Sequence, residues 1–250
     1  MNRISGSGIV KEQKGRFSFL KIAAAILVLL MGSAVAYYFI GAEVIENRGA
    51  TVASFSLPDG SVVKLNQNAV ATYNSATWFL DREIDLMAGE AFFEVEKGEK
   101  FTVETALGDI SVLGTSFNVS LTGSNLKVAC KTGKVKVDLP KGKEALILTP
   151  GKSVDTGLSM NQTSDVNPAT IGGWIRGEFA FENVLVKEVF ETLESQTEYT
   201  IEFSEELKLK YSGQFDINQP ITNILDLVCI PLDLNYSIDQ KTKVVSITKK

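Results

Sequence analysis

The pattern of apolar and polar residues divides the chain into three parts, and the first is a long apolar run. Residues Ile22–Ile40 read IAAAILVLLMGSAVAYYFI and include no charged side chain. As an α-helix rising about 1.5 Å per residue, this run would span roughly 28 Å, close to the hydrocarbon thickness of a bilayer. Basic residues dominate before the run, whereas Glu43 and Glu46 follow it. The sequence therefore predicts a transmembrane helix at 22–40, a cytoplasmic tail at 1–21, and everything later outside.

Two other interpretations of the apolar run are weighed against this anchor. Ala34-Val35-Ala36 has the small-residue pattern of a signal peptide cleavage site. A helix that is apolar all round can also be buried in a protein core. The run continues past Ala36 through Tyr37–Ile40 and has basic residues before it. These features favour an uncleaved single-pass anchor.

The second part, residues 44–155, alternates apolar and polar side chains in short runs separated by turns. In SFSLPDGSVVKL, Asp59-Gly60 lies between two alternating arms, and in DISVLGTSFNVSL the break is at Gly114. Such runs, repeated every eight to twelve residues or so, are typical of an antiparallel β-sandwich or jelly roll, and we expect no helix here. Residues 156–170 are rich in Ser, Thr, Asn and Gly and predict a linker.

In the third part, residues 171–250, strand and helix patterns alternate. The stretch GGWIRGEFAFENV predicts a strand, and YTIEF, YSGQFDI, LNYSI and KVVSITK predict further strands. Between them, two sets of apolar residues have the i, i+3, i+4, i+7 spacing of an amphipathic helix: Val186, Val189, Phe190 and Leu193, then Ile221, Ile224, Leu225 and Val228. Gly177-Glu178-Phe179 returns as Gly213-Gln214-Phe215. The prediction is a mostly β protein that ends in a small α+β domain of duplicated β-α-β units.

Composition excludes several classes of function. The chain has no histidine and only two cysteines, Cys130 and Cys229. A Ser-His-Asp triad, an HExxH zinc site and a four-cysteine zinc site are therefore impossible. A net charge of −5 argues against a nucleic-acid partner. We expect no enzyme and no cofactor, and we expect both cysteines to be buried free thiols.

Several acidic and aromatic residues are candidates for binding. Asp81, Glu83 and Asp85 would line one strand face and could bind Ca²⁺ or cleave a glycoside, but a solvated strand face is favoured. Glu90, Glu94, Glu96 and Glu99 are expected on a similar soluble edge. Phe92 belongs either to a second buried face, which is favoured, or to an exposed contact. Trp174 is either a partner contact or packing between the two domains.

The ordered motifs resemble those of FecR-type anti-sigma regulators. The resemblance rests on LPDGSVVKLNQNA, GEAFFEV, VLGTSFNV, KTGKVKV with LTPG, the tail GEFAFENVLVKEVF after Trp174, YSGQFD and VVSITK. It implies a FecR-like β domain at 44–155 and, at 171–250, a C-terminal domain related to the secretin/TonB short N-terminal fold. The matching positions are expected to shape the fold: Pro58, Asp59, Gly60, Gly89, Glu90, Phe92, Phe93, Gly114, Thr115, Phe117, Asn118, Pro150, Gly151 and Gly213.

What the resemblance implies is cell-surface signalling across the inner membrane, with the C-terminal domains in the periplasm. The periplasmic signalling domain of a TonB-dependent transporter contacts the regulator, regulated membrane proteases cut it, and an extracytoplasmic-function sigma factor is released. Family members carry a multi-helix cytoplasmic domain before the anchor, whereas here 21 residues precede Ile22. Either the chain is incomplete at its start, or sigma binding is lost, carried elsewhere or induced on contact. The alternative function is a membrane-tethered periplasmic ligand- or glycan-binding module without a sigma contact.

Overall fold

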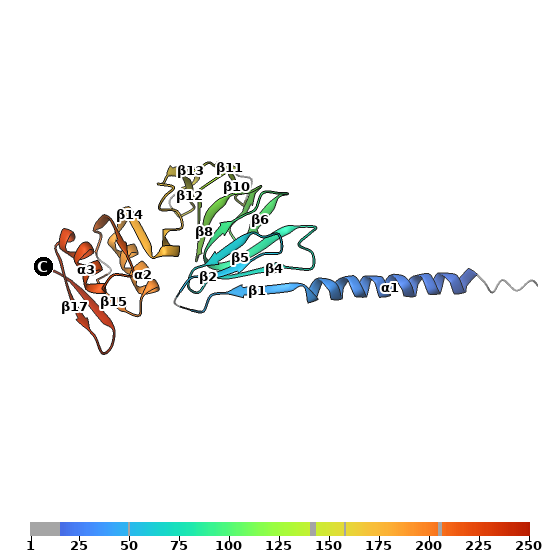
Figure 1. The fold of residues 1–250 in the computed structure, drawn as a ribbon, viewed down its shortest axis with the longest axis horizontal. Helices are drawn as coiled ribbons and strands as arrows, with labels where there is room; N and C mark the ends of the chain where they lie inside the picture. The colour runs from blue at the N-terminus through green and yellow to red at the C-terminus, as the bar shows by residue number, and fades with distance from the viewer. Residues whose placement is uncertain (1–15, 50, 141–143, 158, 205–206) are drawn as a thin grey trace, which may run out of the picture.

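A long helix, a β domain and a smaller α+β domain follow one another along the chain (Figure 1). The computed structural model describes residues 16–49, 51–140, 144–157, 159–204 and 207–250. Helix α1 (Arg16–Ile40) projects from the β domain on the side opposite to the C-terminal domain (Figure 1). Within the described residues, one helical segment, Phe19–Tyr37, is long and apolar enough to cross a membrane. The predicted helix thus exists and begins six residues earlier than the sequence indicated.

Among the described residues, the β domain has 13 strands in two layers that share one strand. The first layer has the order β1-β4-β5-β6-β7-β10-β11, and the second has the order β2-β3-β5-β8-β9-β12-β13. This arrangement confirms a β-sandwich. The strands are β1 (Ala42–Glu46), β2 (Ala53–Ser56), β3 (Val62–Leu65), β4 (Val70–Asn74), β5 (Arg82–Glu94), β6 (Phe101–Glu104), β7 (Asp109–Val112), β8 (Ser116–Thr122), β9 (Asn125–Cys130), β10 (Val135–Asp138), β11 (Leu146–Leu148), β12 (Lys152–Asp155) and β13 (Ser159–Asp165).

Strand β5 joins the two layers because it changes partners at Gly89. Residues before Gly89 pair with β4 and β6, and residues from Gly89 onward pair with β8. Gly89 has φ +85°, and a Cβ there would lie 2.5 Å from Ala69 Cα, so only glycine fits this corner. Since β5 leaves the first layer, β6 returns beside its first half in parallel, with Arg82 opposite Phe101. This parallel pair is a departure from the predicted antiparallel pattern.

The core between the layers consists of the side chains that alternation placed inward. Phe93 and Phe117 stack with ring centroids 5.0 Å apart, and Phe101 packs edge-on against Phe93. Cys130 is buried in the same core, and Cys229 is buried in the C-terminal domain, both as free thiols. The predictions for these strands and for both cysteines are confirmed.

Two segments between the domains differ from their predicted structure. The linker prediction is wrong for residues 159–165, which form β13 at the edge of the second layer beside β12. Residues 162–165 are exposed, and a solvated edge strand needs no apolar alternation, so its composition resembles that of a loop. The strand predicted from Gly172 instead begins with a 3₁₀ turn, η1 (Gly173–Arg176), because Gly172 and Gly177 adopt left-handed conformations at its two ends.

The C-terminal domain contains the predicted duplication. The first unit is β14 (Glu178–Leu185), α2 (Val186–Gln196) and β15 (Thr200–Glu202), and the second is β16 (Lys210–Asp216), α3 (Ile221–Cys229), η2 (Ile230–Leu232) and β17 (Leu234–Asp239), followed by β18 (Val244–Lys249). Strands β14 and β16 pair antiparallel with the repeated Phe179 and Phe215 opposite each other, and β18 lies between β15 and β17. Both helices bury their periodic apolar faces against these strands.

Candidate functional site at the domain contact

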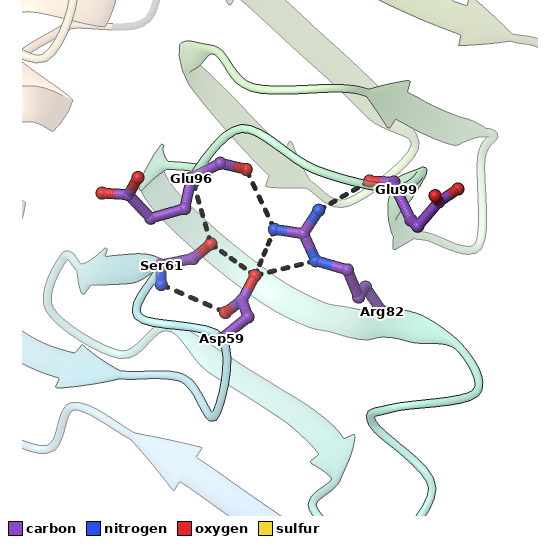
Figure 2. Close-up of polar contacts among 5 residues, drawn as sticks. All are labelled: Asp59, Ser61, Arg82, Glu96 and Glu99. Atoms are coloured by element: carbon purple, nitrogen blue, oxygen red, sulfur yellow. Dashed lines mark hydrogen bonds and ion pairs between the residues drawn. The ribbon is translucent and has the colours of Figure 1, made fainter.

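The Asp59 turn of the β domain is fixed by an ion pair that the sequence pattern did not single out. Asp59 accepts hydrogen bonds from the Ser61 amide at 3.1 Å and the Ser61 hydroxyl at 2.7 Å. The Arg82 guanidinium contacts the same carboxylate through Nε, at 2.8 Å, and through Nη2 (Figure 2). Arg82 also donates to the carbonyl oxygens of Glu96 and Glu99, so one side chain joins the turn to the loop before β6. In the sequence, Arg82 lies on the same face of an alternating strand as the apolar Ile84. A charged residue at such an inward position indicates an ion pair.

The electrostatics of this cluster indicate a structural role. Burial opposes ionisation of Asp59, but the hydrogen bonds from Arg82 and Ser61 outweigh it and hold the pKa of the carboxyl below its usual value. Glu83, in the neighbouring row with Asp81 and Asp85, behaves differently. Its pKa is raised, first by partial burial and then by the nearby carboxylates of Glu104, Asp81 and Asp85. Among the described residues, no cluster of three or more acidic or cysteine side chains is placed to hold a metal ion.

The other motif residues occupy turns, corners and the core. Gly60, Gly114 and Gly151 have positive φ, as Gly89 does. Pro58 and Pro150 are exposed, two residues before Gly60 and directly before Gly151 respectively. Thr115 is buried, and Gly213 pairs with Phe181 across β14 and β16.

The two domains meet through a small apolar cluster around Trp174. Phe92 of β5 points away from the sandwich core and is 3% exposed, and Trp174 of η1 is 7% exposed. They form a cluster with Ala129 and Ile171, against which Phe179 of β14 packs. Phe92 is therefore buried, and Trp174 packs between the domains, leaving little of its surface for a partner. The Lys131 ammonium lies 5.4 Å from the Phe92 ring centroid and donates to the Ile171 carbonyl at 3.0 Å.

Glu90 lies at the centre of a polar chain beside this cluster, so the expectation of a solvated edge residue is wrong for it. Its carboxylate accepts hydrogen bonds from Asn118 Nδ2 at 2.8 Å and Asn66 Nδ2 at 2.9 Å. Asn118 Oδ1 accepts from the Trp174 indole N–H at 2.9 Å, and Asn66 Oδ1 accepts from Gln196 Nε2 at 3.3 Å. Trp174 and Gln196 belong to η1 and α2, so this series of hydrogen bonds reaches the C-terminal domain at both of its ends.

The charge of Glu90 orients the Asn118 amide, and it orients the Asn66 amide together with the Gln67 backbone N–H, which donates to Asn66 Oδ1 at 2.8 Å. A carboxylate only accepts hydrogen bonds, so both amides must turn their NH₂ groups toward it. Both amide oxygens then face the C-terminal domain, where each meets an N–H donor. A glutamine at position 90 would present an NH₂ group to one of the amides and would break one of the two ties. Burial raises the pKa of Glu90, while the bonds from Asn118 and Asn66 oppose that rise.

A groove lies between the β13–η1 connection and the outer face of β14 and β16. Its volume is about 570 Å³, and charged and amide side chains line it, among them Asn167, Arg176, Glu178, Gln214 and Asp216. Arg176 and Glu178 form an exposed ion pair at 2.5 Å. A ligand in this groove would contact the segment that carries Trp174.

Comparisons with known proteins match each domain to a family model. Residues 44–136 match the family described as FecR protein, and residues 178–245 match the family described as FecR, C-terminal. Two crystal structures of candidate anti-sigma factors from Parabacteroides distasonis have TM-scores of 0.74 and 24% identity. The alignments cover 84% and 83% of this chain and 99% of each of those chains. A comparison with curated proteins finds no match.

Proposed function

This chain belongs to the FecR family, and on that premise we propose that it is a membrane-anchored anti-sigma regulator. It relays a signal from the periplasmic signalling domain of a TonB-dependent outer-membrane transporter to an extracytoplasmic-function sigma factor. Helix α1 is the single-pass anchor in the inner membrane. Both FecR domains lie in the periplasm, because basic residues dominate before the apolar run and acidic residues follow it.

The observation that carries this proposal is the polar chain through Glu90. It ties the C-terminal domain to Asn66 and Asn118 of the β domain by two hydrogen bonds, and Glu90 joins these two asparagines. Partner binding at the groove beside Trp174 displaces η1 and breaks the bond from the Trp174 indole to Asn118, which is one of the two polar ties between the domains. The contact therefore behaves as a coupling between the domains, which is what a relay requires.

The signal reaches the membrane through β1. This strand follows α1 directly and pairs with β4, which pairs in turn with β5, the strand that carries Glu90. A change at the domain contact is thereby transmitted to the end of α1, where regulated membrane proteases gain access to the chain. The sigma factor binds on the cytoplasmic side of the anchor.

A truncation tests the proposal. A stop after residue 170 removes the C-terminal domain and leaves the anchor and the sandwich. In cells with a sigma-dependent reporter, we expect the truncated chain to reach the membrane but to lose the response to inducer. An unchanged response would contradict the proposal. A full-length chain that binds no sigma factor, and whose truncation leaves the reporter unaffected, would favour the tethered ligand-binding module.

A further inference from the structure

Two large apolar side chains lie exposed on a loop at the outer end of α1. The loop between β4 and β5 includes Phe79 and Leu80, which are 77% and 74% exposed. A soluble surface gains nothing from two adjacent apolar side chains, so their position requires an account.

The loop is rigidly built. Trp78, next to Phe79, is buried and packs edge-on against Tyr73 at 5.4 Å and Phe101 at 5.8 Å between ring centroids. Asn74 Oδ1 accepts hydrogen bonds from the amides of Ala76 and Thr77. With Trp78 held inward and the preceding turn capped, Phe79 and Leu80 are held outward.

The same loop is bound to the last turns of α1. The Tyr37 hydroxyl donates to the Ala76 carbonyl at 3.1 Å, and both the amide and the hydroxyl of Ser75 donate to the Gly41 carbonyl. A Cβ on Gly41 would lie 2.3 Å from Ala76 Cβ and 2.7 Å from Ala76 N, so the helix end and the loop are in close contact. The loop cannot move away from the helix without breaking these bonds.

These contacts fix the height of the loop relative to a bilayer. Tyr37 is the last residue of the apolar segment Phe19–Tyr37, and tyrosine is enriched where a membrane helix meets the headgroups. Ala76 lies within one hydrogen bond of Tyr37 and three residues before Phe79. Phe79 and Leu80 therefore lie at the level where the hydrocarbon core meets the headgroups.

The same edge of the first layer carries further groups suited to an interface. The pairings of Arg82 with Phe101 and of Phe101 with Val112 place Lys100 and the exposed Leu113 at this edge. Asp81 and Glu99 line a cavity with Lys100 there, so the charges are mixed. The contact therefore depends on apolar insertion and not on anionic lipid.

We propose that Phe79 and Leu80 insert into the outer boundary of the bilayer beside α1, giving the β domain a second membrane contact. The inference rests on the proposed function only in that α1 spans the membrane. A helix alone leaves the sandwich free to rotate about its axis, whereas a second contact fixes one orientation. A displacement of the β domain then acts against a fixed support at the end of α1.

Lipid-restricted quenching tests this contact in the full chain. Phe79→Cys, Leu80→Cys, Leu29→Cys and Ile230→Cys are each labelled with the environment-sensitive fluorophore NBD. The variants are reconstituted in phosphatidylethanolamine–phosphatidylglycerol vesicles with nitroxides on shallow or deep acyl carbons. Leu29 reports the anchor, and Ile230 is an exposed control in η2, on the domain opposite to α1 (Figure 1). Because Cys130 and Cys229 are buried, the unsubstituted chain gives the background.

We expect shallow nitroxides to quench the label at 79 and 80, deep nitroxides to quench it at 29, and neither to quench it at 230. The result should be the same without phosphatidylglycerol. Quenching at 29 with none at 79 and 80 would overturn this inference and leave the proposed anchor intact. No quenching at 29 would overturn the anchor and this inference together. Quenching at 230 as well would show that the contact is not specific to the loop.

Discussion

Arg82 is the residue on which the Asp59 turn depends. Its side chain is 12% exposed and that of Asp59 is 14% exposed, so removing the cation leaves a desolvated carboxylate without its partner. We expect Arg82→Met to lower the free energy of unfolding by about 3 kcal/mol. Urea unfolding of the full chain in detergent, followed by tryptophan fluorescence, measures this loss.

An exposed pair provides the matched control. Lys136 and Asp138 form a bond of 2.7 Å with side chains 49% and 40% exposed. Lys136→Met should cost less than about 1 kcal/mol, because solvent screens such a pair. Equal losses in the two variants would contradict the role assigned to Arg82.

The lowered pKa of Asp59 predicts the sign of a pH effect. A carboxyl with a lower pKa in the folded state adds stability above its unfolded value, near 3.9, and that stability is lost as pH falls through the folded pKa. Asp59→Asn should therefore be less stable than the natural chain at pH 7, and the gap should narrow below about pH 4. Unfolding midpoints across this pH range check it, and a constant gap would refute it.

Single residues were the hardest part of the site to predict from sequence. Glu90 occurs in an acidic, alternating stretch, so its side chain looked solvated. Its carboxylate instead binds Asn66 and Asn118, whose amide oxygens contact α2 and η1, more than eighty residues after Glu90 in the sequence. The apolar Phe92 and Trp174 are recognisable as candidates in the sequence, but only the fold shows that they belong to the same cluster.

At the scale of elements, η1 depends on Gly172. This residue has φ +72°, and a Cβ there would lie 2.7 Å from Phe92 Cδ2. Gly172→Ala should cost about 1–3 kcal/mol from backbone strain and should also push η1 away from Phe92. Hydrogen exchange of residues 171–177 should rise.

Gly123→Ala is the control for this substitution. Gly123 also has a positive φ, +56°, but nothing lies within 4 Å of its Cβ position. This variant should lose stability from backbone strain, but hydrogen exchange in η1 should not become faster. If both variants leave η1 equally protected, Gly172 does not support the domain contact.

Elements were predictable where packing imposes a period. The core strands and both helices of the C-terminal domain bury every second residue or one helical face, and these patterns were visible in the sequence. Residues 162–165 of β13 are all exposed and so show no such period, and η1 is defined by the backbone of two glycines. The parallel pairing of β6 follows from the corner at Gly89, which local alternation does not encode.

At the scale of the whole molecule, a continuous series of contacts connects the C-terminal domain to the end of α1. The domain contact, β5, β4, β1 and the end of α1 follow one another without a flexible connection among the described residues that carry them. In the proposed function, this continuity is the route by which a partner on the last domain affects the anchor. It also means that the coupling can be broken at one side chain.

Glu90→Gln, with Glu94→Gln as its control, tests this coupling most directly. Both residues lie on β5, but Glu94 is 44% exposed and pairs only with Lys64 among the contacts described for its carboxylate. The measurement is the ratio of induced to uninduced sigma-dependent transcription in cells with equal amounts of membrane-bound chain. We predict that the ratio falls to near one in Glu90→Gln and stays at the natural value in Glu94→Gln. A Glu90→Gln chain that keeps the full ratio would contradict the account.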